Sequence, residues 1–144
     1  MSLILPNLYL GSLKVAQDPK FLKDKKIKHV LSCGLFSYPP GNLKFLKRRK
    51  ELPMKDNHIE PVLFYFQESF DFITSALAQN EAVLVHCLKG MSRSASIVIS
   101  YILRSSYVEE RPLTLAQAIK FVSERHPQSF PNKHFLANLA KLER

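Results

Sequence analysis

The sequence predicts a single α/β domain in which a small, mostly parallel, twisted sheet is flanked by helices. Residues 82–85 form a short continuous apolar run, which is typical of a strand covered on both faces. An amphipathic segment precedes this run and a mostly apolar segment, residues 94–103, follows it, so a buried strand is expected between two helices. The 144 residues, 46% of them hydrophobic, can form one core without disulfides or structural metals.

Strand and turn signals dominate the first third of the chain. The extended segments expected there are residues 8–10, 28–33 and 42–53. Asp18 followed by Pro19 is typical of a helix start, because aspartate caps a helix and proline suits its first turn. We expect a loop from Gly34 through the cluster Pro39-Pro40-Gly41.

Helical periodicity marks the rest of the chain. Apolar residues recur at steps of three or four along a helix whose stripe should face the sheet: Val62, Phe66, Phe70, Ile73 and Leu77. Thr114 and Gln117 form a capping box that opens a helix over residues 115–124. Asn132 can cap the last helix, residues 133–142.

The charge balance favours anionic partners. Twenty-one Lys and Arg residues against twelve Asp and Glu give a formal net charge of +9, which suits phosphoproteins, phospholipids or nucleic acid. The most basic run is either a solvated edge strand or a docking surface for an acidic partner, and it carries Lys44, Lys47, Arg48, Arg49 and Lys50.

Cysteine usage and the N-terminus bear on localisation. Cys33 and Cys87 offer neither a metal-ligand spacing nor a disulfide framework, so we expect a reducing compartment, the cytoplasm or also the nucleus. Cys33 is expected in the core, with a redox partnership with Cys87 as the alternative. No signal peptide or membrane span is visible, and Ser2 excludes myristoylation. The histidines show no metal-ligating pattern, and no cofactor is expected.

The segment from His86 to Ser94 places a cysteine between a predicted strand and a predicted helix. Such a turn aims backbone N–H groups inward, and the helix dipole adds partial positive charge. Gly90 permits the tight backbone that this requires. We therefore expect a phosphate site formed by Leu88, Lys89, Gly90, Met91, Ser92 and Arg93.

Cys87 is the predicted nucleophile and Arg93 the predicted phosphate clamp. A thiol at a helix N-terminus beside a cation loses its proton near neutral pH. A guanidinium group can hold two phosphoryl oxygens and follow them into the transition state. Arg93 stands six positions after Cys87, and Cys33 serves as an internal comparison because Pro39, not an arginine, stands six positions after it. Only Cys87 therefore carries the pattern.

Asp56 is the predicted general acid, because it lies in a polar loop before the long helix. Glu60 and Asp71 are nearby carboxylates, and Asp56 itself can be read as a turn residue. Further roles are expected for Ser94, whose hydroxyl can hydrogen-bond the leaving thiolate, and for two residues that hold the loop in shape, His86 and Asn132. The alternative roles are a core histidine for His86 and a plain helix cap for Asn132.

Residues 86–94 resemble the signature of the dual specificity protein phosphatases, within the protein tyrosine phosphatase superfamily: His-Cys, two residues, Gly, two residues, Arg, then Ser or Thr. The chain is most similar to the small, atypical members, which lack an additional docking domain. Segments that resemble the family's opening strand pair, next strand, acid loop and closing helix start are residues 5–12, 27–31, 52–56 and 131–136.

The resemblance implies one catalytic domain over residues 1–144 with the fold of the cysteine-dependent phosphatases. It implies metal-independent hydrolysis of phosphotyrosine and phosphoserine or phosphothreonine in phosphoproteins, through a phosphocysteine intermediate. In the family, alanine is commoner directly before the glycine and a small or branched residue directly after it. This chain departs from that pattern with Lys89 before Gly90 and Met91 after it. The alternatives are a catalytically weak phosphate-binding scaffold and a phosphatase for RNA 5′-phosphates or phosphoinositides, although nucleic acid is not the expected partner.

Overall fold

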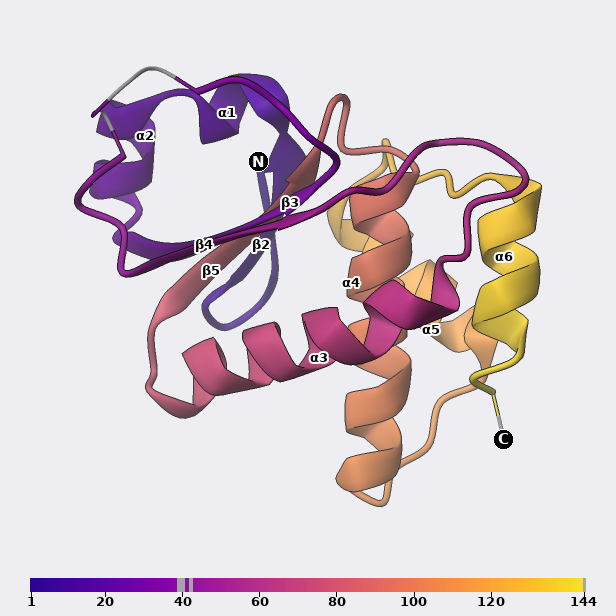
Figure 1. Ribbon diagram of the computed structural model, residues 1–144. Coiled ribbons are helices and arrows are strands. Elements are labelled where there is room, and N and C mark those ends of the chain that lie inside the picture. Colours follow the sequence, from indigo (N-terminus) through magenta and orange to yellow (C-terminus); the bar gives the residue numbers. More distant parts are fainter. Residues whose placement is uncertain (39–40, 42, 144) are drawn as a thin grey trace.

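The computed structural model describes residues 1–38, 41 and 43–143, so the predicted Pro39-Pro40 turn lies outside the described residues. Figure 1 shows a sheet wrapped by helices. The helices and strands of the chain are, in sequence order, β1 (Ser2–Leu5), β2 (Leu8–Ser12), α1 (Leu13–Ala16), α2 (Pro19–Asp24), β3 (Ile27–Cys33), β4 (Arg48–Leu52), α3 (Leu63–Ala78), β5 (Ala82–Cys87), α4 (Arg93–Val108), α5 (Leu115–Arg125) and α6 (Lys133–Ala140).

The sheet has the order β1-β2-β5-β3-β4, with β5 at its centre. β1 pairs antiparallel with β2, and the other neighbours pair in parallel, which confirms the predicted mostly parallel sheet. The register places Ser12 beside Cys87 and Ser32 beside His86. The carboxyl ends of β2, β3 and β5 therefore meet at one edge of the sheet.

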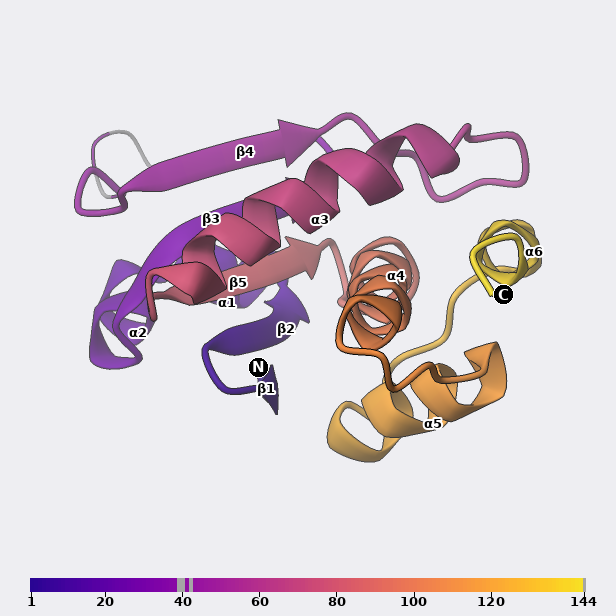
Figure 2. The same cartoon turned by 90° about the horizontal axis from the view of Figure 1, so that it is seen from below.

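The two faces of the sheet are covered by different helices. In Figure 2, which looks at the molecule from below, α3 lies in front of the strands with α4, α5 and α6 beside it, whereas α1 and α2 lie behind the sheet, as Figure 1 shows from the side. Every residue of β5 is buried: Val83 and Val85 belong to the core beneath α3 to α6, and Ala82 and Leu84 to the smaller core beneath α1 and α2. This alternation explains why the central strand is apolar throughout.

α3 and α4 confirm the predicted helices on either side of β5. α3 buries Phe66 and Ile73, as its periodicity predicts, together with Phe72. α4 contacts α3, α5, α6 and the sheet, which accounts for an apolar sequence around most of its circumference. Among the described residues, no helix is long and apolar enough to cross a membrane.

The predicted caps form as expected. Asp18 accepts a hydrogen bond from the Phe21 N–H at the start of α2. The Thr114 and Gln117 side chains form the reciprocal capping box of α5. The local sequence therefore sets where these helices begin.

One predicted segment is wrong in its extent. Of the extended region expected from residue 42 to 53, the described residues 43–53 contain a strand only over Arg48–Leu52, and the Leu46 N–H bonds to the Leu43 carbonyl in a turn before it. α1 was not expected, because its single turn is too short to show helical periodicity.

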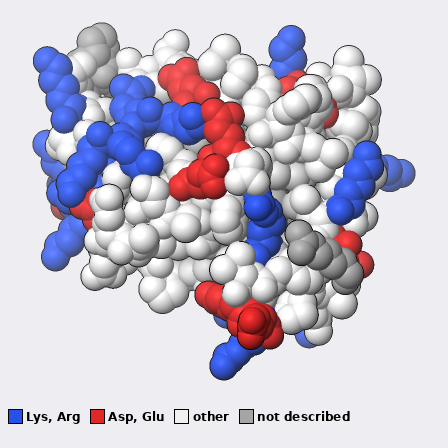
Figure 3. Space-filling model, turned by 60° about the horizontal axis from the view of Figure 1, so that its bottom comes forward, with Lys and Arg blue, Asp and Glu red and all other residues white. Residues whose placement is uncertain are grey.

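The basic run is partly occupied by contacts within the protein. β4 lies at the sheet edge, and Figure 3 shows Lys and Arg side chains gathered at one end of a face with acidic side chains beside them. Lys47 pairs with Glu81, whereas Arg48 donates to His29 and to the Phe72 carbonyl, both at 3.0 Å. Arg48 is therefore engaged inside the protein, and docking of an acidic partner at this run stays a prediction.

Candidate active site

The predicted phosphate-binding loop connects the carboxyl end of β5 to the first turn of α4. Cys87 is only 3% exposed, and its Sγ accepts a hydrogen bond from the Gly90 N–H at 3.2 Å. The Ser94 hydroxyl lies 3.1 Å from the same sulfur. Two polar groups thus contact the sulfur atom, and Ser94 lies where its predicted hydrogen bond to the leaving thiolate can form.

Gly90 has a backbone conformation and a location that admit no side chain. Its φ is +71°, and a Cβ placed on it would lie 2.8 Å from the Gly11 carbonyl oxygen in β2. The neighbouring Leu88 carbonyl accepts from the Leu13 N–H at 3.1 Å, which connects the loop to the start of α1, directly after β2. The loop is therefore packed closely against the sheet edge.

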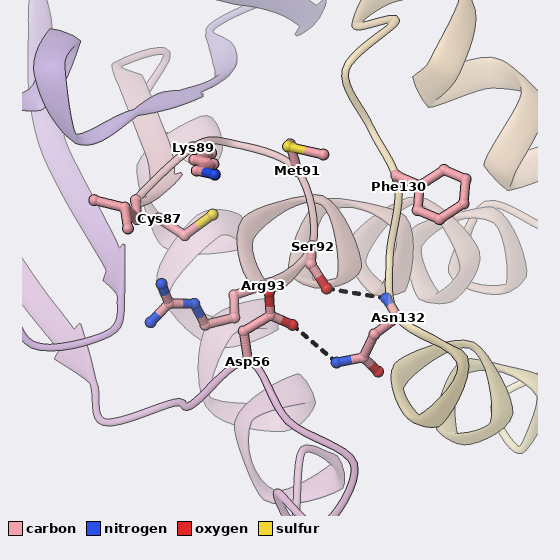
Figure 4. Close-up of a pocket in the computed structure, with 9 residues that line it drawn as sticks. Asp56, Cys87, Lys89, Met91, Ser92, Arg93, Phe130 and Asn132 are labelled. Atoms are coloured by element: carbon pink, nitrogen blue, oxygen red, sulfur yellow. Dashed lines mark hydrogen bonds between the residues drawn. The ribbon is translucent and has the colours of Figure 1, made fainter.

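A pocket of about 520 Å³ opens above the loop (Figure 4). It is lined by Asp56, Cys87, Leu88, Lys89, Met91, Ser92, Arg93, Phe130 and Asn132. The predicted nucleophile and clamp come from one loop and the predicted acid from a separate segment, and all three line a single pocket. The lining includes two cations and one carboxylate, so the pocket favours an anionic guest.

Arg93 is held in position by the segments that follow β3 and β4. Its Nη1 donates to the Met54 carbonyl oxygen at 3.2 Å, and its guanidinium lies 5.4 Å from the centre of the Phe36 ring. Gly34 has φ +136°, and a Cβ there would approach the Arg93 Nη1 to 2.6 Å. Gly34 thus leaves space for the guanidinium, which is oriented before any substrate binds.

Asn132 connects the acid loop, the phosphate-binding loop and α6. Its side-chain amide donates to Asp56 Oδ1 at 2.8 Å, and its backbone N–H donates to Ser92 Oγ at 3.0 Å (Figure 4). Its Oδ1 accepts from the Phe135 N–H at 2.8 Å and caps α6. Asn132 therefore caps α6 and contacts Asp56 at the same time, so the two predicted roles are compatible.

His86 lies beneath the loop rather than in the pocket. The side chain is fully buried, and burial lowers its pKa to about 4, so the imidazole is neutral at neutral pH. Its Nδ1–H donates to the Cys87 carbonyl oxygen at 3.2 Å, which leaves Nε2 as an acceptor facing the Ser32 and Tyr38 hydroxyls at 2.8 and 2.7 Å. His86 is thus placed to hold the loop in shape, and this role stays a prediction.

Cys33 is part of the core at the end of β3. It is completely buried, and burial is the main reason why its pKa is raised well above the usual value, with a further contribution from Cys87. Both cysteines are free thiols. The predicted core position of Cys33 is confirmed, and its redox partnership with Cys87 stays untested.

Two residues of the site were not identified from the sequence. His126 is buried and donates from Nε2 to the Gly90 carbonyl at 2.8 Å, although the two residues lie 36 positions apart, and no sequence pattern indicates this contact. Phe130 lines the pocket and is 74% exposed. The sequence signal that could have pointed to Phe130 as a pocket residue is its position just before Pro131 and the predicted cap Asn132.

The chain is similar to known proteins in both sequence and structure. Residues 8–144 match the family described as "Dual specificity phosphatase, catalytic domain". Human dual specificity protein phosphatase 16 is 36% identical over 98% of this chain, which spans only 20% of that relative. Dual specificity protein phosphatase 1B of Arabidopsis thaliana is 32% identical over 100% of this chain and 82% of its own length.

Solved structures agree with these matches. The crystal structure of DUSP15 has a TM-score of 0.86 and 28% sequence identity, and the match covers 98% of this chain and 85% of that one. The human tyrosine phosphatase-like serine/threonine/tyrosine-interacting protein also has a TM-score of 0.86, with 29% identity over 98% of this chain and 93% of that one. The phosphatase fold expected from the resemblance is thereby confirmed.

Proposed function

Because the chain belongs to the dual specificity phosphatase family, we propose that it hydrolyses phosphotyrosine and phosphoserine or phosphothreonine in phosphoproteins through a phosphocysteine intermediate. The observation that carries the proposal is the shared pocket of Cys87, Arg93 and Asp56, with the Gly90 N–H directed at the Cys87 sulfur. A nucleophile, an anion clamp and a proton donor are what phosphomonoester hydrolysis requires.

In the first step, the Cys87 thiolate attacks phosphorus, and an S–P bond forms as the P–O bond to the substrate side chain breaks. Arg93 and the backbone N–H groups of the loop hold the three non-bridging oxygens as negative charge spreads over them. Asp56 lies at the pocket, held by Asn132, and gives its proton to the departing oxygen.

In the second step, water attacks the phosphocysteine, and the Asp56 carboxylate takes the proton that this water loses. The S–P bond breaks and inorganic phosphate forms. The Ser94 hydroxyl, 3.1 Å from Sγ, donates to the departing thiolate and makes it a better leaving group. Side chains and backbone groups of the chain supply each proton and each counter-charge, so we expect the reaction to proceed without a metal.

The first experiment is hydrolysis of a small aryl phosphate between pH 5 and 8 in EDTA. We expect turnover by the native protein, none by Cys87→Ser, and about a hundredfold or greater loss of kcat in Arg93→Ala. Asp56→Asn should lose about a hundredfold in kcat, because the departing oxygen then lacks its proton donor. Each loss follows from removal of one role in the two steps.

A freshly reduced native protein without turnover contradicts the proposal. It would favour a phosphate-binding scaffold, and one structural neighbour is described as a phosphatase-like interacting protein. A matched panel of phosphotyrosine and phosphothreonine peptides, a 5′-phosphorylated RNA and a phosphoinositide then ranks the substrate classes. Two free thiols suit a reducing compartment, and we propose the cytoplasm.

A further inference from the structure

Two neighbouring apolar side chains lie at the mouth of the pocket. Met91 follows Gly90 in the phosphate-binding loop, and Phe130 precedes the cap of α6. Both line the pocket, and they are 39% and 74% exposed. Figure 4 shows them on the side of the pocket away from Cys87. We call this pair the apolar shelf.

The backbone of the shelf is fixed on both sides. The Phe130 N–H donates to the Met91 carbonyl at 2.7 Å, and two residues later the Asn132 N–H donates to Ser92 Oγ at 3.0 Å. Pro131 between these contacts is buried. The segment carrying Phe130 is therefore attached to the phosphate-binding loop, and its ring is presented next to the site at little additional entropic cost.

The two steps of phosphoryl transfer do not require an apolar surface. The phosphoryl group needs the thiolate, the guanidinium, the backbone N–H groups and the carboxylate, all of which are polar. A single exposed phenylalanine is ordinary on a protein surface. Phe130, however, lies beside another exposed apolar residue on the wall of the catalytic pocket. A part of the substrate outside the phosphoryl group would cover both side chains.

We propose that the apolar shelf binds a large apolar side chain next to the phosphorylated residue, which makes phosphoproteins with such a neighbour the preferred substrates. The inference rests on the proposed phosphatase function and adds a specificity determinant to it. Contact with an apolar surface discriminates between substrates by about tenfold or more for a small difference in side-chain size. A leucine in place of a serine should therefore give about a tenfold preference.

The test compares two phosphotyrosine peptides that differ only at the residues on either side of the phosphotyrosine, leucine in one and serine in the other. Their affinities are measured by fluorescence anisotropy with Cys87→Ser, which retains the pocket but does not turn over. We expect about tenfold tighter binding of the leucine peptide. Adding Phe130→Ala should reduce the ratio of the two affinities to near one.

Phe64→Ala in the Cys87→Ser background is the matched control, because Phe64 is 79% exposed but does not line the catalytic pocket. It should keep the tenfold ratio. Equal affinities before Phe130 is changed, a preference that survives Phe130→Ala, or no binding of either peptide overturns the inference. Aryl phosphate hydrolysis by the native protein separates the two proposals: turnover without a peptide preference removes only the shelf, whereas a preference without turnover removes only the phosphatase activity.

Discussion

His126 joins the N-terminal strand to the phosphate-binding loop, although it belongs to neither. The Ser2 hydroxyl lies 2.7 Å from its Nδ1, and its Nε2–H donates to the Gly90 carbonyl at 2.8 Å. Burial is the main reason why the pKa of His126 is lowered, so the ring is neutral and one nitrogen donates while the other accepts. Because the Gly90 N–H bonds to the Cys87 sulfur, hydrogen bonds connect His126 to the proposed nucleophile through Gly90.

We expect His126→Leu to lower kcat for an aryl phosphate by about tenfold, because the Gly90 carbonyl loses its partner and the loop loses its fixed position. His126→Gln offers an amide donor of similar reach and should restore most of kcat. Both variants are also unfolded in urea. A His126→Leu protein that is less stable but keeps the native kcat would limit His126 to a role in stability.

At the scale of elements, β5, the phosphate-binding loop and α4 together position Cys87, and Gly90 lets the loop approach β2. In Gly90→Ala, the new methyl carbon would lie 2.8 Å from the Gly11 carbonyl oxygen, and the alanine would have to adopt a φ of +71°, which residues with a side chain rarely do. We expect kcat to fall about a hundredfold, since displacement of a catalytic group by about 1 Å has that effect. The free energy of unfolding should fall by about 1–3 kcal/mol.

Gly41→Ala is the control for that substitution. Gly41 has a similar φ of +75°, but the nearest atom to its added Cβ is a Lys44 side-chain carbon at 3.7 Å. It therefore shows the effect of backbone conformation without the collision. If both variants keep native kcat, the close packing of the loop against β2 is not what positions Cys87.

The elements that were predicted correctly carry their signal within one segment. β5 is a continuous apolar run, α3 shows a helical period, and α5 has its capping box, so burial or local hydrogen bonding dictates each from nearby residues. The short α1 and the late start of β4 have no such local signal.

The features of the site are likewise of two kinds, those encoded within one segment and those formed between distant segments. The spacing of Cys87 and Arg93 within one loop predicts both roles. The hydrogen bond from Asn132 to Asp56 joins positions 76 apart, and that from His126 to Gly90 joins positions 36 apart. Such contacts depend on how the helices pack, which no local pattern records.

Over the whole molecule, three buried histidines resist protonation. His29 in β3, His86 in β5 and His126 after α5 are each at most 5% exposed, and burial is the main cause of the lowered pKa of each. In the unfolded chain, these side chains are exposed and bind protons with the ordinary pKa of 6.5. Between the two pKa values the unfolded state binds more protons than the folded state, so the free energy of unfolding rises with pH.

His86 should dominate this effect, because its pKa falls from 6.5 to about 4. Its contribution is intact above pH 6.5 and is lost progressively as the pH falls toward 4, which amounts to about 2 kcal/mol between pH 7 and pH 5. Urea unfolding at both pH values should show this loss in the native protein and a smaller loss in His86→Gln. His58→Gln, which replaces an exposed histidine, is the control and should behave as the native protein does. An equal loss in His86→Gln and in the native protein would mean that carboxylates or the other buried histidines, rather than His86, set the acid sensitivity of the fold.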